Sequence, residues 1–408
     1  MIQNMPDISI QAFDYPLPDS QIALFPTEKR DESRLLTYQH GQIKHSYFKE
    51  LPNLLPSNSL LVFNNTKVIP ARMLIQKATG TTIELFLLKP MTNQVATQVV
   101  MEQQGESCWE CLIGNKKRWK SGETLTKEIT LQDETVLITI NWIDRGINLI
   151  KLTWTGDHSF AAVLDCIGQM PLPPYLERET EISDQERYQT VFSKVLGAVA
   201  APTASLHFSQ DVFDQLRKKG IKESYLTLHV GAGTFLPVKE DEIRNHPMHR
   251  EQLIFSKAFI QQIIDHQGPF IPVGTTALRA LESLYWSGVW LLEGQKVPET
   301  GLVIPKEFAY RVRENYSNKE SLKAILSYLQ EQAQENWIAE TELLIMPTYT
   351  FRFCEALITN FHQPKSTLLV LVSALIGEGW KEVYQEAIDQ KYRFLSYGDA
   401  CLFFNNQQ

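Results

Sequence analysis

Apolar and polar residues alternate over one long stretch of the chain, from Met73 to about Trp154. The alternating runs are separated by polar turns that contain glycine, and they fall at residues 82–88, 109–113, 136–142 and 148–154. Because successive side chains of a strand point to opposite faces, this period of two predicts antiparallel strands and almost no helix. A series of short strands of this kind is typical of a small β-barrel.

The segments on both sides of this stretch mix strand and helix patterns. Apolar runs at residues 59–63 and 225–230 predict buried strands. Helical spacing predicts helices over 211–219 and 368–376, the second with Ser366 as its N-cap. We therefore expect a discontinuous α/β main domain at residues 1–72 and 155–408, interrupted by a small antiparallel β-barrel domain at residues 73–154.

Residues 286–340 carry a further helical stripe, made of Leu322, Ile325, Leu326, Leu329 and Ala333. We interpret this segment as an inserted accessory helix that acts as a lid.

Composition is that of a globular protein, with 43% hydrophobic and 21% charged residues in 408. No apolar run approaches the roughly 20 residues that span a bilayer, and the first ten residues lack a secretory pattern. Five cysteines, an odd number, fit a reducing compartment. We expect a cytoplasmic monomer without a membrane segment.

Cys108 and Cys111 form a single Cys-x-x-Cys pair. The sequence around them alternates like a strand, so the two thiols are expected on opposite faces, and no second pair completes a zinc site. We predict no bound metal.

The net charge of −8 argues against indiscriminate nucleic-acid binding but allows a local basic patch. One candidate is the turn at residues 114–122, where four basic residues surround Trp119. This turn either contacts phosphates while a base stacks on the tryptophan ring, or is only a solvated hairpin tip, and the two interpretations are equally good. Arg34 ends a charged loop. Either Arg34 pairs with a phosphate or a carboxylate, or the loop is only a solvated surface. Lys365 precedes a helix N-terminus, where the two together present positive potential.

Residues 197–238 carry the strongest candidate chemistry. A turn of small residues at 200–205 contains Thr203, and the strand at 225–230 runs into Gly231-Ala232-Gly233-Thr234. Glycines after a strand let backbone N–H groups approach a ligand, although a plain tight turn is an equal alternative. His207 and His229 end the two halves, so each is able to bring an imidazole to one pocket; a satisfied core histidine is the commoner alternative.

Two further groupings follow. His249 lies two residues from Glu251, close enough to orient it or to share a proton with it. Thr275 or Thr276 is expected to cap a helix whose N-terminus binds an anionic group, with Arg279 on its first turn.

The phrases GAVAAPTASLHF at 197–208 and TLHVGAGTF at 227–235 resemble signature segments of the S-adenosylmethionine:tRNA ribosyltransferase-isomerase family of queuosine synthesis. Further phrases of that family run in order from Phe13 to Asp399, among them PLPPY, RYQTV and TNFHQPKST. The chain departs from the family's usual pattern at a few positions: Asn65 in place of Asp, Lys67 of Arg, Ala198 of Ser, and Ser205 and Thr348 of Gly.

The resemblance implies an enzyme that transfers and isomerises the ribosyl part of S-adenosylmethionine onto 7-aminomethyl-7-deazaguanine at the tRNA wobble position. The product is epoxyqueuosine, and adenine and methionine are released. S-adenosylmethionine would be a co-substrate, with no prosthetic group, and the modified tRNA would be the partner.

The implied reaction suggests a role for each candidate residue. The acid–base candidates are His207 and His229, with Glu251 and His249 as the alternative pair. The expected S-adenosylmethionine contacts are Thr203, Gly231, Gly233, Thr234, Thr275, Thr276 and, on the methionine carboxylate, Arg279. The expected tRNA contacts are Arg34, Arg72, Lys116, Lys117, Arg118, Lys120 and Lys365.

Two other classes of protein remain open at this point. An S-adenosylmethionine-dependent RNA methyltransferase would share both ligands, but the chain lacks a Gly-x-Gly-x-Gly opening with an acidic partner about 20 residues on. A non-catalytic RNA-binding protein would explain the barrel but not the small-residue loops.

Overall fold

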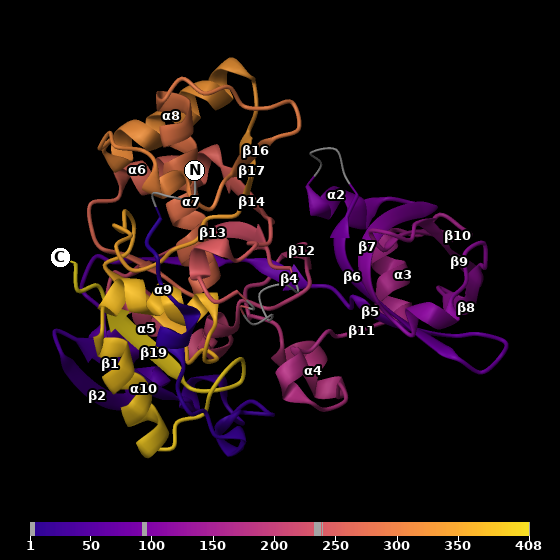
Figure 1. Ribbon diagram of the computed structural model, residues 1–408, viewed down its shortest axis with the longest axis horizontal. Helices are drawn as coiled ribbons and strands as arrows, with labels where there is room; N and C mark the ends of the chain where they lie inside the picture. Colours follow the sequence, from indigo (N-terminus) through magenta and orange to yellow (C-terminus); the bar gives the residue numbers. More distant parts are fainter. Residues whose placement is uncertain (1–4, 92–95, 232–237, 239, 408) are drawn as a thin grey trace.

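Two sheets form the larger part of the computed structural model, which describes residues 5–91, 96–231, 238 and 240–407 (Figure 1). The six-stranded sheet has the order β15-β3-β13-β14-β17-β16 and the four-stranded sheet the order β18-β19-β1-β2. Their strands are β15 (Phe270–Pro272), β3 (Leu60–Asn64), β13 (Lys222–His229), β14 (Glu251–Ser256), β17 (Asn336–Thr341), β16 (Leu302–Ile304), β18 (Ala356–Asn360), β19 (Ala400–Phe404), β1 (Arg34–Gln39) and β2 (Gln42–Tyr47).

The two sheets meet side by side at β15 and β18. Val273, just after β15, bridges Ile358 of β18 in parallel, and the Gly274 N–H donates to the Ile358 carbonyl at 2.8 Å. Every residue of β3 and β18 is buried, as expected for strands that are covered on both faces. The apolar run predicted at 59–63 is therefore a central strand.

Helices cover these sheets. They are α1 (Leu51–Leu54), α5 (Gln210–Lys218), α6 (Lys257–Asp265), α7 (Thr275–Leu292), α8 (Asn318–Glu331), α9 (Thr367–Ile376) and α10 (Gly379–Asp389). The predicted helices at 211–219 and 368–376 correspond to α5 and α9, and Ser366 caps α9 by accepting from the Leu369 N–H, as expected.

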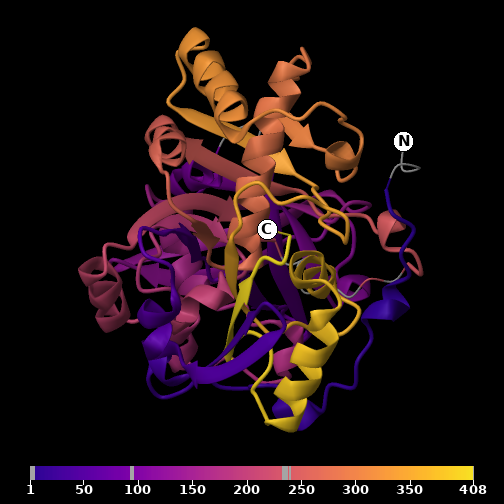
Figure 2. The same ribbon diagram turned by 90° about the vertical axis from the view of Figure 1, so that its left-hand side faces the viewer.

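Residues 286–340 belong to the main core and do not form a separate lid. Figure 2 shows α8 lying beside α7, and β16 and β17 extend the six-stranded sheet. The helices approach closely because Gly288 has no side chain, since a Cβ there would lie 2.1 Å from the Ser321 carbonyl oxygen. The apolar stripe Leu322, Ile325 and Leu329 is buried against this core.

A third, curled sheet is antiparallel and seven-stranded, with α3 (Phe160–Ile167) inside its curve (Figure 1). Its order is β11 (Gly168–Gln169), β5 (Arg72–Gln76), β6 (Thr82–Pro90), β7 (Glu106–Gly114), β10 (Leu149–Trp154), β9 (Glu134–Asp144) and β8 (Leu125–Leu131). Each alternating run found in the sequence lies in one of these strands. Among the described residues no ladder joins β8 to β11, so the sheet is curled and open where a closed barrel was expected.

Trp119 differs from the sequence-based interpretation. Its ring is completely buried and stacks on Trp142 with centroids 4.2 Å apart, so it fills the core and is not available to a nucleobase. Its indole N–H donates to the Glu123 carbonyl at 2.8 Å, which satisfies the ring's polar atom inside the fold.

The remaining elements join the curled sheet to the rest. They are β4 (Thr66–Val68), β12 (Val195–Ala198), α2 (Thr97–Glu102) and α4 (Ile182–Arg187). β4 precedes the curled sheet in the chain and β12 follows it, and the two pair in parallel. No helix in the described part of the chain is long and apolar enough to cross a membrane.

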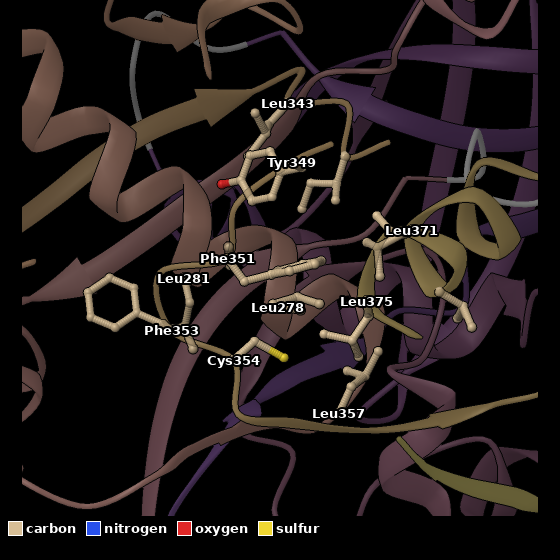
Figure 3. Close-up of a cluster of buried hydrophobic side chains, with 14 of the residues drawn as sticks. Leu278, Leu281, Leu343, Tyr349, Phe351, Phe353, Cys354, Leu357, Leu371 and Leu375 are labelled. Carbon is tan, nitrogen blue, oxygen red and sulfur yellow. The ribbon is translucent and has the colours of Figure 1, made fainter. Parts of the chain in front are cut away.

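A large hydrophobic cluster lies around α7 (Figure 3). Leu278 and Leu281 of α7 pack there near Leu371 and Leu375 of α9. Glu282 follows directly in the chain and is fully buried. Its carboxylate accepts from the Tyr349 hydroxyl at 2.7 Å and from the N–H groups of Arg352 and Phe353 at 3.0 and 2.9 Å.

Burial raises the pKa of Glu282 from its ordinary value of 4.5 to about 7, despite these hydrogen bonds. The folded protein therefore holds this proton more tightly than the unfolded chain does. The corresponding stability is present below pH 4.5 and is lost as the pH rises to about 7.

We predict that the free energy of unfolding of Glu282→Gln depends less on pH than that of the unchanged protein. The difference should reach about 3 kcal/mol between pH 4.5 and 7, because the amide cannot ionise. Urea unfolding at several pH values measures it. Glu331→Gln, an exposed change on α8, is the control and should follow the unchanged protein; equal pH dependence in the Glu282 variant would contradict the assignment.

Candidate active site

A cleft of about 700 Å³ lies between the six-stranded sheet and the curled sheet. His229 and Gly231 lie on its wall, where β13 ends. Two contacts cross from one sheet region to the other. Lys89 of β6 pairs with Glu340 of β17 at 2.6 Å, and the Thr97 N–H at the start of α2 donates to the Gln252 side-chain oxygen of β14 at 3.2 Å.

His229 lines this cleft, and its two ring nitrogens differ in their surroundings. Its ring is 8% exposed, Nδ1 lies 3.3 Å from the Thr66 Oγ1, and Nε2 is buried without a hydrogen-bond partner among the described residues. Burial lowers the pKa of His229 to about 4, so the imidazole is neutral near pH 7 and able to accept a proton.

Gly197 sets the position of this ring. It lies in β12 with φ 136°, and a Cβ on it would be 2.9 Å from the His229 imidazole. Both the backbone conformation and the close approach require glycine.

His207 is held on both sides. It ends the 3-10 helix Thr203–His207, with Nδ1 2.8 Å from the Ser33 Oγ and Nε2 3.0 Å from the Asn360 Nδ2. Because an amide nitrogen only donates, Nε2 accepts and Nδ1 carries the hydrogen. Burial, with Arg393 and Arg30 nearby, lowers the pKa of His207 to about 3. His207 lines neither the cleft nor the two smaller cavities beside it.

A second cavity, of about 70 Å³, shares Val230 with the cleft. Thr203, Thr275 and Thr276 line it, so the structure brings together three of the residues expected to hold S-adenosylmethionine. The expected threonine N-cap is wrong: Gly274 is the N-cap of α7, and no side chain caps that end. Glycine is able to make the sharp turn from β15 into the helix, so no hydroxyl cap is needed.

Glu251 and Arg279 form a buried ion pair in a third, adjoining cavity of about 40 Å³, which Thr275 and Thr276 also line. Burial lowers the pKa of Arg279 to about 10. His249 lines the same cavity but is exposed, and partial burial, His246 and Arg279 lower its pKa. A substrate carboxylate on Arg279 would share the guanidinium with Glu251.

Four of the expected tRNA contacts already have partners in the protein. Arg34 donates to the Gln390 carbonyl at 2.7 Å and lies 3.7 Å from the Tyr392 ring centroid, Arg72 pairs with Glu84 at 2.6 Å, Lys116 donates to the Arg145 carbonyl at 2.8 Å, and Lys365 pairs with Asp14 at 2.8 Å. Lys117, Arg118 and Lys120 are exposed. Gly233 and Thr234 lie outside the described residues.

Asn360 and His362, which received no role from the sequence, also line the second cavity. Asn360 ends the fully buried strand β18 and His362 follows it by two residues, and this position at the end of a buried strand is the signal that marks them. In the described part of the chain, no group of three or more His, Cys, Asp or Glu residues is arranged to hold a metal ion.

The protein thus combines a mixed α/β core with a curled antiparallel sheet, and a cleft lined by His229 lies between them. The chain belongs to the queuosine biosynthesis protein family, whose sequence profile matches residues 10–403.

Named relatives match over nearly their whole length. The S-adenosylmethionine:tRNA ribosyltransferase-isomerase of Trichlorobacter lovleyi is 35% identical over 401 residues, covering 96% of this chain and 99% of the relative. The protein of that name from Treponema denticola is 36% identical over 396 residues, covering 96% and 98%. A crystal structure of S-adenosylmethionine tRNA ribosyltransferase from Thermotoga maritima has 26% identity and a TM-score of 0.45, covering 96% of this chain and 99% of that one.

We predict that Glu251→Gln lowers the free energy of unfolding by about 3–5 kcal/mol, because it leaves the Arg279 charge buried without its partner. Arg250→Ala is the matched control. It removes a neighbouring pair with Glu342 whose arginine side chain is 55% exposed, and it should cost less than about 1 kcal/mol. Urea unfolding measures both, and similar losses would mean that the Glu251–Arg279 pair is solvated.

Proposed function

We propose that this chain is an S-adenosylmethionine:tRNA ribosyltransferase-isomerase. It transfers and isomerises the ribosyl part of S-adenosylmethionine onto 7-aminomethyl-7-deazaguanine at the tRNA wobble position, and adenine and methionine leave. The observation that carries the proposal is the extent of the match: relatives with that name align with at least 96% of this chain at 35–36% identity.

The cleft suits the first chemical demand of this reaction. The sulfonium of S-adenosylmethionine acidifies the adjacent 5′ carbon, and a base must lie within hydrogen-bond reach of that carbon. His229 is the proposed base, because its Nε2 is buried at the cleft and has no protein partner among the described residues. His207, whose two nitrogens are both bonded, is assigned a positioning role through Asn360.

The two smaller cavities suit S-adenosylmethionine. Thr203, Thr275 and Thr276 would line its nucleoside, and Arg279 would bind its carboxylate. Gly231, on the wall of the adjoining cleft, would allow close approach of the backbone. The larger cleft would then take the tRNA base, and the two substrates would meet at Val230, which lines both the cleft and the second cavity.

The curled sheet would act as an inserted domain at residues 73–154, with its exposed Lys117, Arg118 and Lys120 near tRNA phosphates. Its hydrophobic cluster reaches beyond those bounds, from Ile69 to Ile167, and also includes Val199. We further propose that the enzyme works in the cytoplasm as a monomer, with S-adenosylmethionine as a co-substrate and without a prosthetic group.

Product analysis tests the function. With tRNA that carries the aminomethyl deazaguanine, the enzyme should release adenine and methionine in equal amounts; with tRNA that carries guanine it should release neither. Formation of S-adenosylhomocysteine would instead identify a methyltransferase. Absence of any product would leave an RNA-binding protein as the better description.

We predict opposite effects for the two histidines. His229→Asn should lose at least about a hundredfold in turnover with little change in melting temperature, since it removes a proton acceptor. His207→Asn retains at most one of two buried hydrogen bonds, so it should lose about 1–3 kcal/mol of stability. Turnover and thermal unfolding of both variants decide this, and normal turnover in His229→Asn would move the base role to Glu251 and His249.

A further inference from the structure

His362 is held by hydrogen bonds at its carbonyl, its backbone N–H and its ring. The Tyr15 hydroxyl donates to its carbonyl, and its N–H donates to the Tyr384 hydroxyl at 3.1 Å. Its ring Nε2 lies 3.0 Å from the Thr359 Oγ1. Both tyrosine rings are largely buried and lie edge to face with centroids 5.1 Å apart.

These contacts leave one ring atom for a ligand. His362 is 8% exposed and lines the cavity of about 70 Å³ next to the cleft. Its Nδ1 has no hydrogen-bond partner among the described residues, whereas its other polar atoms are engaged. A polar ring of this kind, nine-tenths buried and fixed at a cavity wall, is a contact prepared for a bound molecule.

The cavity favours a flat heteroaromatic ring. Small and apolar residues form much of its wall, including Ala200, Ala201, Pro202 and Leu395. At roughly 10–15 Å³ for each water, the cavity of about 70 Å³ holds about five to seven waters, which is the scale of a fused ring.

We propose that this cavity binds the purine of S-adenosylmethionine and that the His362 Nδ1–H donates a hydrogen bond to a ring nitrogen of that purine. The inference rests on the proposed function and extends it by assigning the contact that recognises the leaving group.

The Thr359 hydroxyl makes this direction of donation available. A neutral imidazole has one N–H and one acceptor nitrogen, and a threonine hydroxyl is able to donate to the acceptor. Purine ring nitrogens accept, so the bound purine selects the tautomer in which Thr359 donates to Nε2 and Nδ1 donates to the ligand. Burial lowers the pKa of His362 to about 3, which keeps the ring neutral.

The same hydrogen bond strengthens as adenine departs. The glycosidic C–N bond breaks, its electron pair passes to the purine, and the negative charge that develops there attracts the N–H. The His362 proton remains on the imidazole, and the released purine takes its proton from water. His362 is thus a purine-binding residue that favours departure without transferring a proton.

Two substitutions at this position separate the two ring nitrogens. The amide of His362→Asn reaches the place of Nδ1 and keeps a donor at the cavity, whereas the longer His362→Gln reaches the place of Nε2 and keeps the Thr359 contact. Calorimetry with S-adenosylmethionine alone should show about tenfold weaker binding for His362→Gln and a smaller loss for His362→Asn. In the tRNA reaction, kcat of His362→Gln should fall by about 10²-fold.

Analogues of S-adenosylmethionine with one purine ring nitrogen replaced by C–H test the contact in the unchanged protein. One such analogue should bind about tenfold more weakly than S-adenosylmethionine, and His362→Gln should no longer distinguish the two. Equal affinity for all analogues, no measurable binding, or a greater loss in His362→Asn than in His362→Gln overturns the inference. Because calorimetry needs no turnover, failure of adenine release counts against the proposed function and not against the purine contact.

Discussion

The parallel pairing of β4 with β12 is the contact on which the arrangement of this protein depends. These strands lie on either side of the curled sheet in the chain, so their pairing brings the chain back to the place from which it left. The register shifts between Leu196 and Ala198, which puts Gly197 at the irregular position beside the His229 ring. The Val199 N–H then donates to the Val230 carbonyl at 3.0 Å, which joins β12 to the end of β13. One irregular strand pair therefore fixes both the junction with the curled sheet and the position of the imidazole.

A buried polar atom without a hydrogen-bond partner among the described residues lies where this pairing places the cleft. A buried polar atom without a hydrogen bond costs about 1–3 kcal/mol, so folded proteins rarely keep one without a use. His229 keeps such an atom, although Thr66 and Gln252 show that hydrogen-bonding groups are close by in the same region. A cost of this kind is recovered when a ligand supplies the missing partner, which is why we propose the cleft, and not the fully bonded site at His207, as the place for chemistry.

Periodicity revealed much of the fold, because it reports local geometry. The alternation at residues 136–142 and the Ser366 cap correspond to β9 and α9. The sequence misplaced features that depend on distant neighbours. Trp119 looked exposed because its own segment is basic, yet Trp142 covers it. The Glu251–Arg279 pair joins a strand to a helix 28 positions further along the chain, and the sequence spacing does not predict that contact. The predicted closed barrel was wrong for the same reason, because closure requires pairing between the edge strands β8 and β11, which local periodicity does not report.

Three histidines show why the sequence alone could not identify the candidate site. His207, His229 and His362 are all buried, all lie at the end of a regular element, and burial lowers the pKa of all three, so neither sequence nor pKa separates them. Their partners do. An imidazole bonded at both nitrogens cannot exchange a proton without breaking a buried hydrogen bond, whereas one with a free nitrogen can. The division of roles is therefore decided by side chains far away in the chain, Ser33 and Asn360 for His207 and Thr66 for His229.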